Sequence, residues 1–181
     1  PVREMGGLVW TYMGPDPAPV LPPWDLFVWP NAIRQIGMCV LPCNWLQCQE
    51  NALDPIHSVY LHGHFFKYIL ERQGKLDTRA SDHGTHRAYN SMKLGFGIES
   101  IWGNETEYGM EKGVIYSKKL GAEKDRNERH AYVIFPFYTR PGGGGIRREF
   151  QIRVPIDDTQ TLHINYQIFV APPGIQVSPQ E

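Results

Sequence analysis

Five segments in the C-terminal half of the chain alternate between apolar and polar residues or are rich in β-branched and aromatic residues, which is the pattern of half-buried strands. They are SMKLGFGIESIWG, YGMEKGVIYSKK, HAYVIFPFYTR, IRREFQIRVPI and TLHINYQIFVA. The turn sequences GNET, GAEKDRNER and PGGGG separate the first four, and PIDDTQ joins strands expected at 146–154 and 161–170. Because strands with short links pair antiparallel by default, this half is expected to form an antiparallel sheet.

A helical segment precedes these strands, from Asn44 to about Gln73. It carries apolar residues along its length and no glycine before Gly63, which is expected to end the helix. Pro55 breaks this helix or opens a new one, with Asp54 as the N-cap. A second short helix is expected from about residue 65 to residue 72, closing at the glycine two residues later. A helical segment followed by an antiparallel sheet predicts the α+β class.

The N-terminal part of the chain is poor in regular structure. Residues 8–13 alternate and are rich in aromatic side chains, so they predict a strand that runs directly into a loop. Six prolines then lie between Pro15 and Pro30. Because proline fixes φ and removes a hydrogen-bond donor, this stretch is expected to be an extended connector without regular structure. Both ends of the sequence look cut, as in a fragment of a longer protein.

The overall composition excludes several classes of function. A net charge of −1 gives no electrostatic basis for binding nucleic acid or an anionic membrane. No apolar run approaches the roughly 20 residues that span a bilayer, and the first residues do not have the basic-plus-apolar pattern expected of a signal segment. The three cysteines, at positions 39, 43 and 48, have neither a disulfide framework nor zinc-knuckle spacing. They are expected in a core or on a strand, in the reducing cytoplasm.

One short cluster stands out against this background. Asp54, His57, His62 and His64 lie within eleven residues of a chain that has only seven histidines. One interpretation is structural: the acid caps a helix, and the histidines are half-buried or at the surface. The other interpretation is a site, because histidine is the commonest metal ligand and an apolar helix is a costly place for imidazoles without partners, at roughly 1–3 kcal/mol each.

The spacing of the histidines makes a structural prediction. Two residues four apart on an ideal α-helix lie about 40° apart around the axis, whereas five apart means about 140°. His57 and His62 are five apart, so they share a metal only where the helix is irregular or ends between them. We therefore predict a π-bulge or a helix end between these two residues.

The run CNWLQCQENALDPIHSVYLHG resembles the mononuclear-iron motif of the Rieske non-haem iron aromatic-ring-hydroxylating oxygenases, an Asn-rich lead-in followed by Asp-x2-His-x4-His. REMGGLVWTYMGPDPAP is similar to the stretch that closes the Rieske domain of that family and enters its catalytic domain. RVPIDDTQTLHINY resembles a strand pair of the phthalate-dioxygenase-like branch. The resemblance covers the chain from about Arg3 to Tyr166.

The resemblance implies roles for individual residues. His57 and His62 would be the two imidazole ligands of a mononuclear Fe(II), completed by a carboxylate. Asp54 would be the acid that connects this iron to the 2Fe-2S Rieske cluster of a neighbouring subunit. Asn51 would lie next to the ligands without binding the metal. His64 departs from the plain motif as a third local imidazole, and it is expected to be solvated or next to the ligands rather than bound to the metal.

Two parts of such a site are expected outside the sequence. The Rieske cluster's Cys and His pairs would lie upstream of Pro1, and the third iron ligand, an Asp, beyond Glu181. Asp157 and Asp158 match the turn motif of the family rather than its ligand position.

The resemblance also implies an architecture: a curved antiparallel sheet wrapped around helices, of the helix-grip or START-like type. Residues 1–30 would be the end of the Rieske domain with its connector, and residues 31–181 an incomplete catalytic domain. The activity would be O2-dependent hydroxylation, dihydroxylation or oxidative demethylation of an aromatic or similar small molecule. Electrons would come from NAD(P)H through a reductase or ferredoxin, and the assembly would be a homotrimer.

Two other functions fit parts of the pattern. A non-enzymatic module of the same architecture encloses an apolar ligand, but it has no reason to bring His57 and His62 together. A zinc hydrolase needs a third local ligand and a general base, for which Asp54 and His64 would have to serve, and their spacing disfavours this.

Overall fold

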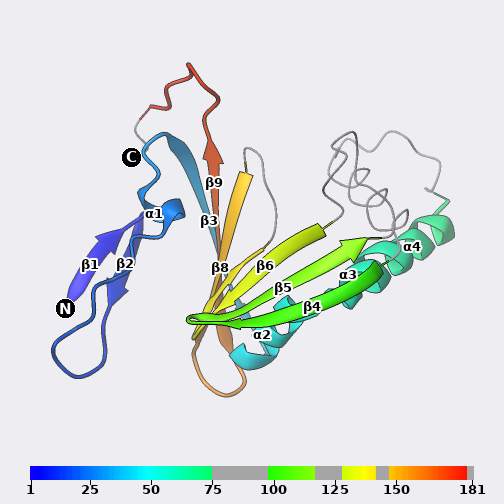
Figure 1. The fold of residues 1–181 in the computed structure, drawn as a ribbon, viewed down its shortest axis with the longest axis horizontal. Coiled ribbons are helices and arrows are strands. Elements are labelled where there is room, and N and C mark those ends of the chain that lie inside the picture. The colour runs from blue at the N-terminus through cyan, green and yellow to red at the C-terminus, as the bar shows by residue number, and fades with distance from the viewer. Residues whose placement is uncertain (75–97, 117–127, 142–146, 179–181) are drawn as a thin grey trace. The chain divides into compact units, whose positions relative to one another are not determined.

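The structure is a computed structural model that describes residues 1–74, 98–116, 128–141 and 147–178 (Figure 1). The chain forms two compact units. The first combines Pro1–Asn44 with Gly143–Glu181, and the second is Trp45–Gly142.

The first unit begins with a hairpin in place of the single strand expected there. Strands β1 (Val2–Met5) and β2 (Leu8–Thr11) pair antiparallel. Gly6 and Gly7 connect them with φ angles of 66° and 77°, a left-handed conformation that glycine adopts at no steric cost. The Gly-Gly pair was therefore a turn signal, and the strand N-terminal to it was missed.

The proline-rich stretch contains one turn of helix, α1 (Asp25–Val28), so the expectation of no regular structure there was wrong. The Asp25 carboxylate accepts a hydrogen bond from the Leu26 amide at 3.0 Å. Leu26 and Phe27 are almost fully buried. Burial of these two side chains explains why a helical turn forms among prolines, because packing overrides local preference.

Three antiparallel strands complete the first unit in the order β3–β9–β8. They are β3 (Ala32–Leu41), β8 (Arg147–Pro155) and β9 (Thr161–Val170). Strands β8 and β9 were expected at almost these positions, whereas β3 was not. In the turn between β8 and β9, the Asp157 carboxylate accepts hydrogen bonds from the amide and hydroxyl of Thr159 at 2.7 and 2.9 Å.

The core of this unit forms around Tyr166, which is fully buried on β9. Its hydroxyl donates to the Gly6 carbonyl at 2.7 Å and accepts from Arg34 Nε at 3.0 Å. The Phe27 ring packs edge-on against the rings of Tyr166 and Phe150, with centroids 5.0 and 5.8 Å apart. These contacts attach the hairpin and α1 to one face of the strands.

The second unit starts with four successive helical elements. They are α2 (Trp45–Leu53), α3 (Ile56–Val59), the π-helix η1 (Tyr60–Phe65) and α4 (Phe66–Arg72). Gly63 lies inside η1, so the expectation that it ends the helix was wrong. The chain leaves α4 at Gly74, which has a φ of 65° and lies where the helix was expected to close.

Four antiparallel strands follow in the order β7–β6–β5–β4, and Figure 1 shows β4, β5 and β6 side by side. They are β4 (Ile98–Thr106), β5 (Gly109–Tyr116), β6 (Glu128–Ile134) and β7 (Tyr138–Arg140). The GNET sequence lies within β4, and the turn to β5 is formed by the next two residues, Glu107 and Tyr108. Most of GAEKDRNER and nearly all of PGGGG lie outside the described residues.

A buried glutamine attaches α2 to this sheet. Gln49 is 1% exposed. Its amide nitrogen donates to the carbonyls of Pro136 and Tyr138, and its amide oxygen accepts from the Thr139 hydroxyl at 2.8 Å. Because a buried amide without partners is costly, this set of hydrogen bonds locates α2 on the β6–β7 segment.

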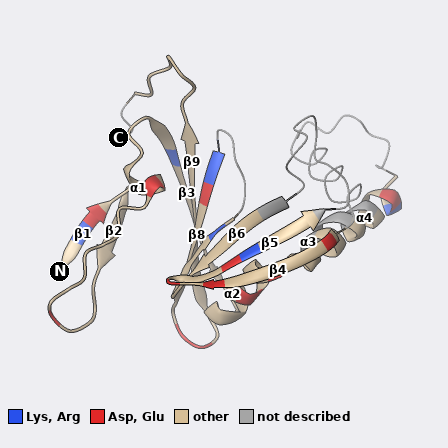
Figure 2. Ribbon diagram, viewed as in Figure 1, with Lys and Arg blue, Asp and Glu red and all other residues tan. Residues whose placement is uncertain are grey.

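The α+β class with antiparallel sheet structure is confirmed. Figure 2 shows basic and acidic residues next to each other on β5 and β8. Within the described part of the chain, no helix is long and apolar enough to cross a membrane. Cys39 lies exposed on β3 and Cys48 is buried in α2, while Cys43 is half-buried just after β3; none of the three forms a disulfide.

Candidate functional site

Asp54 forms the junction between α2 and α3. One carboxylate oxygen accepts a hydrogen bond from the Ile56 amide at 2.8 Å, and the other accepts from the His57 amide at 3.1 Å. The two amides belong to the first two residues of α3, so the Asp54 carboxylate caps this helix across Pro55, whose backbone is already helical. The predicted helix restart at Asp54–Pro55 is confirmed.

The same carboxylate holds the side chain of His57. Asp54 Oδ2 lies 3.2 Å from His57 Nδ1. Partial burial acts to raise the pKa of Asp54, but hydrogen bonds from the Ile56 and His57 amides and the attraction of His57 outweigh it and lower the pKa. Asp54 is therefore a carboxylate at neutral pH. When His57 donates its Nδ1 proton to that carboxylate, the lone pair of the ring lies on Nε2.

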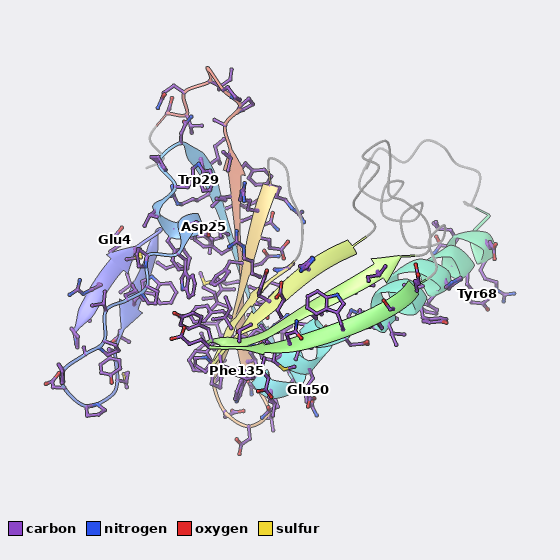
Figure 3. The ribbon with its side chains drawn as sticks, viewed as in Figure 1. Glu4, Asp25, Trp29, Glu50, Tyr68 and Phe135 are labelled. Carbon is purple, nitrogen blue, oxygen red and sulfur yellow. The ribbon has the colours of Figure 1, made fainter. Side chains whose placement is uncertain are left out.

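The helix widens directly after His57. The π-helix η1 begins at Tyr60, between His57 and His62, so the predicted irregularity is confirmed in the backbone. A π-turn spans one residue more than an α-turn and brings residues five apart closer to the same side of the axis. The side chain of His62 is not among the described ones, so its meeting with His57 stays a prediction. Figure 3 labels Glu50 on α2 and Tyr68 on α4, on either side of this segment.

The two neighbouring residues named from the sequence are both exposed. Asn51 lies on α2, in the turn before Asp54. The ring of His64 lies against the ring of Tyr60, with centroids 5.5 Å apart and planes inclined by 31°. Within the described part of the chain, no three His, Cys, Asp or Glu side chains are grouped as ligands of one metal ion.

The structure adds one residue that the sequence did not reveal. Lys112, on β5, donates a hydrogen bond from its ammonium group to the carbonyl of Ala52, in the last turn of α2. Burial lowers the pKa of Lys112, and the attraction of Asp54 opposes this only in part. Sixty residues separate Lys112 from Ala52, so no local pattern signalled this contact.

Asp157 and Asp158 lie in the β8–β9 turn of the first unit. Hydrogen bonds to Asp157 from Thr159 and from the Gln160 amide lower the pKa of that carboxyl, and the Asp158 carbonyl accepts from the Asn44 side chain at 3.0 Å. These contacts are those of a turn motif, as the sequence indicated.

Known proteins similar in sequence are oxygenase subunits. No family model matches the chain. The oxygenase subunit of 5,5'-dehydrodivanillate O-demethylase from Sphingobium sp. is 50% identical over 100 residues, which are 51% of this chain and 23% of that protein. The oxygenase subunit of phthalate 4,5-dioxygenase from Pseudomonas putida is 29% identical over 163 residues, 88% of this chain and 34% of that subunit. The chain therefore spans between about a quarter and a third of these relatives.

Solved structures with a similar fold are also oxygenases. The terminal oxygenase of carbazole 1,9a-dioxygenase from Nocardioides aromaticivorans IC177 matches with a TM-score of 0.54 at 14% identity, over 96% of this chain and 49% of that one. A carbazole-bound oxygenase in complex with ferredoxin matches with a TM-score of 0.55 at 19% identity, over 96% of this chain and 47% of that one. At these identities, the likeness establishes the fold.

The motif from Asp54 to His62, the sequence relatives and the fold converge on one group of proteins. The chain is similar in sequence to segments of oxygenase subunits, in agreement with the resemblance of its motif to that of the Rieske non-haem iron oxygenases.

Proposed function

We propose that the chain is the catalytic-domain segment of a terminal oxygenase component that uses O2 and a mononuclear Fe(II). The reaction is hydroxylation, dihydroxylation or oxidative demethylation of an aromatic or similar small molecule. One observation carries the proposal: Asp54 orients His57 at the start of a helix that widens into a π-turn before His62. Bulges of this kind concentrate at functional sites.

The described residues fit an iron site. Asp54 accepts from His57 Nδ1, which leaves the lone pair of the imidazole on Nε2, the nitrogen that would bind the metal. The π-turn supports His62 as the second ligand, since it reduces the angular separation of the two histidines. Iron bound by two histidines and a carboxylate keeps open positions, and it supplies the activation of dioxygen. The carboxylate ligand is proposed beyond Glu181.

The residues of this chain have defined tasks in the proposed reaction. In this proposal, His57 and His62 bind the metal. Asp54 holds the His57 ring in one tautomer and orientation through the contact to Nδ1. We propose that the wide turn of the backbone brings the second imidazole, that of His62, to the same side as His57. Asn51 and His64 lie nearby and are proposed to support the site without binding the metal.

We further propose a 2Fe-2S Rieske cluster upstream of Pro1, with Asp54 as the residue that links it, across a subunit contact, to this site. Electrons would come from NAD(P)H through a reductase or ferredoxin. A solved neighbour of this fold is in complex with ferredoxin, which supports a partner of that kind. A homotrimer provides the neighbouring subunit that such a link requires.

The names of the relatives support an aromatic substrate. They act on 5,5'-dehydrodivanillate and phthalate, one by demethylation and one by dioxygenation. Three cysteines without a disulfide support a reducing, cytoplasmic setting. The division into a Rieske-domain end with connector at residues 1–30 and a catalytic domain from residue 31 stays a prediction. All relatives named above are parts of enzymes, which favours an oxygenase over a binding module.

The experiment that tests this function uses the complete protein with a reductase and NADH. We expect substrate-dependent O2 uptake and an oxidised product with at least one member of a panel of carboxylated and methoxylated aromatic compounds. His57→Ala and His62→Ala are expected to abolish turnover. His64→Ala, at an exposed histidine that is proposed to support the site without binding the metal, is expected to reduce turnover much less. Turnover in His57→Ala, or none in a folded, fully reconstituted parent protein, would contradict the proposal.

A further inference from the structure

Lys112 has an unusual position for a basic residue. It lies on β5 opposite Gly103 of β4 and Ala131 of β6. Lys112 lies on the same face of the sheet as Val114, which is 5% exposed. The aliphatic part of the lysine side chain therefore lies on the buried face, and the residue as a whole is half-buried. The small residues on both sides leave room for the lysine side chain to leave the sheet toward the helix.

The ammonium group of Lys112 contacts the end of α2. It donates to the carbonyl of Ala52, and α2 ends at the next residue, Leu53. Carbonyls in the last turn of a helix lack partners within the helix, and the helix dipole favours a cation there. Lys112 therefore satisfies a terminal carbonyl and attaches this end of α2 to β5.

Asp54 follows directly after this attached turn. Its amide donates to the Glu50 carbonyl at 3.0 Å, and its carboxylate holds both the amide and Nδ1 of His57. The negative charge of Asp54 attracts the ammonium group of Lys112. The chain of contacts thus runs from β5 through the end of α2 to Asp54 and then to the His57 ring.

We propose that Lys112 is a positioning residue for the metal site, which fixes Asp54 and, through Asp54, the orientation of His57. This inference rests on the proposed function, because it gives His57 a metal to bind. Lys112 contacts neither the metal nor the substrate and is not a catalytic residue.

The sign of the effect on metal affinity distinguishes positioning from simple charge. Removing an ammonium group near a cation site takes away repulsion, so a purely electrostatic role predicts tighter metal binding in a neutral variant. Positioning predicts the opposite, because a loosely held Asp54 no longer orients His57. If Lys112 has only a structural role, its replacement lowers the stability of the protein by the same amount whether or not Asp54 is present.

The test is a double-mutant cycle in the complete protein, with Co(II) as the probe and its absorption titration as the readout. Lys112→Met keeps the aliphatic stem and removes the donor and the charge. We expect it to weaken Co(II) binding about fivefold in the parent, the factor of roughly one hydrogen bond, and by less than about twofold when Asp54 is already Ala. Lys112→Arg, which keeps the charge and the donors, is expected to retain affinity near that of the parent.

Met110→Leu, two residues earlier on the same face of β5, is the matched control and should leave Co(II) affinity unchanged. Unchanged or tighter binding in Lys112→Met overturns the inference, as does an equal loss with and without Asp54. If Lys112→Met does not fold, Lys112→Gln, which is too short to span the same contact, replaces it in the cycle. A folded parent that binds no Co(II) contradicts the proposed function itself, which separates the two failures.

Discussion

Asp54 combines two tasks at the scale of a single residue: it caps α3 and it orients His57. Replacement by Asn and replacement by Ala distinguish these two tasks. Asn retains an N-cap acceptor, whereas Ala removes it at a typical cost of about 1 kcal/mol. We expect Asp54→Ala to lower the free energy of unfolding by about that amount, and Asp54→Asn to change it by only a few tenths.

Catalysis should respond differently from stability at this position. Asp54→Asn is expected to leave iron bound and to slow turnover strongly, because an amide has no negative charge with which to link the two redox centres. Urea unfolding, iron content and coupled turnover of the complete protein measure the three effects. Normal coupled turnover in Asp54→Asn would remove Asp54 from the mechanism.

His163 gives a pH-dependent prediction in the first unit. Its Nδ1 is buried and has no hydrogen-bond partner within the described part of the chain. Burial lowers the pKa of His163, and Arg153 on β8 lowers it further, while Glu149 opposes this. The unfolded chain takes up a proton near pH 6.5, but the folded chain does so only at lower pH. The contribution of neutral His163 to the free energy of unfolding is therefore fully present above about pH 6.5. It is lost as the pH drops toward the folded-state pKa.

Replacing His163 with Gln should flatten this dependence. The unfolding midpoint of the parent is expected to fall more than that of His163→Gln between about pH 7.5 and about pH 5.5, the range around the reference pKa of histidine. Thermal unfolding at the two pH values measures the difference. Equal slopes for both proteins would show that another group causes the acid sensitivity.

At the scale of elements, two glycines of the β4–β5 pair form a matched test of packing. A Cβ on Gly113 would lie 2.1 Å from the Trp102 indole, whereas a Cβ on Gly103 would meet its nearest neighbour at 3.8 Å. Gly113→Ala must displace the indole, and overpacking of this kind costs about 1–3 kcal/mol. Gly103→Ala should be neutral or stabilising, since alanine loses less backbone entropy than glycine. Urea unfolding checks the ranking, and equal effects would contradict the packing of Trp102.

The elements that the sequence predicted best are those with a local pattern. β8 and β9 alternate cleanly because one face of each is buried against the hairpin and α1. The helix restart at Asp54 follows from an N-cap acid before proline, a signal confined to four residues. The irregular turn at Tyr60 was predictable only by assuming that His57 and His62 act together.

The elements that the sequence did not predict depend on distant partners. β3 pairs with β9, which lies 120 or more residues later in the chain. Its mostly exposed face carries apolar residues such as Ile33 as well as polar ones, so the sequence of β3 shows little alternation between apolar and polar residues. α1 forms because its two apolar side chains are buried in the core of the first unit. The contact of Lys112 with Ala52 likewise joins a strand and a helix that are far apart in sequence.

At the scale of the whole molecule, the proposed site is divided among segments. If the third ligand lies beyond Glu181 and the Rieske cluster upstream of Pro1, residues 1–181 provide only two ligands. Two imidazoles hold Fe(II) weakly, because Fe(II) ranks low in the divalent affinity order. We expect the isolated segment to bind iron poorly, to aggregate through uncovered apolar surface and to show no oxygenase activity.

Lengthening the segment at each end should restore iron binding and oxygenase activity in two steps. Downstream residues are expected to bring stoichiometric iron, and the upstream domain should bring turnover with reductase and NADH. Iron analysis and product assays of the three lengths measure both steps. One tightly bound iron and hydroxylation by residues 1–181 alone would place the third ligand within them, and Asp157 and Asp158 would be examined first.

The central claim is that His57 and His62 bind the same iron. Crystals of the complete protein, measured at the iron absorption edge, locate each iron directly. We predict one isolated iron peak, separate from the cluster, with a nitrogen of His57 and a nitrogen of His62 both at about 2.0–2.2 Å, the range of metal–imidazole bonds. An iron bonded to neither histidine, or imidazoles that face opposite sides of the helix, would contradict the assignment.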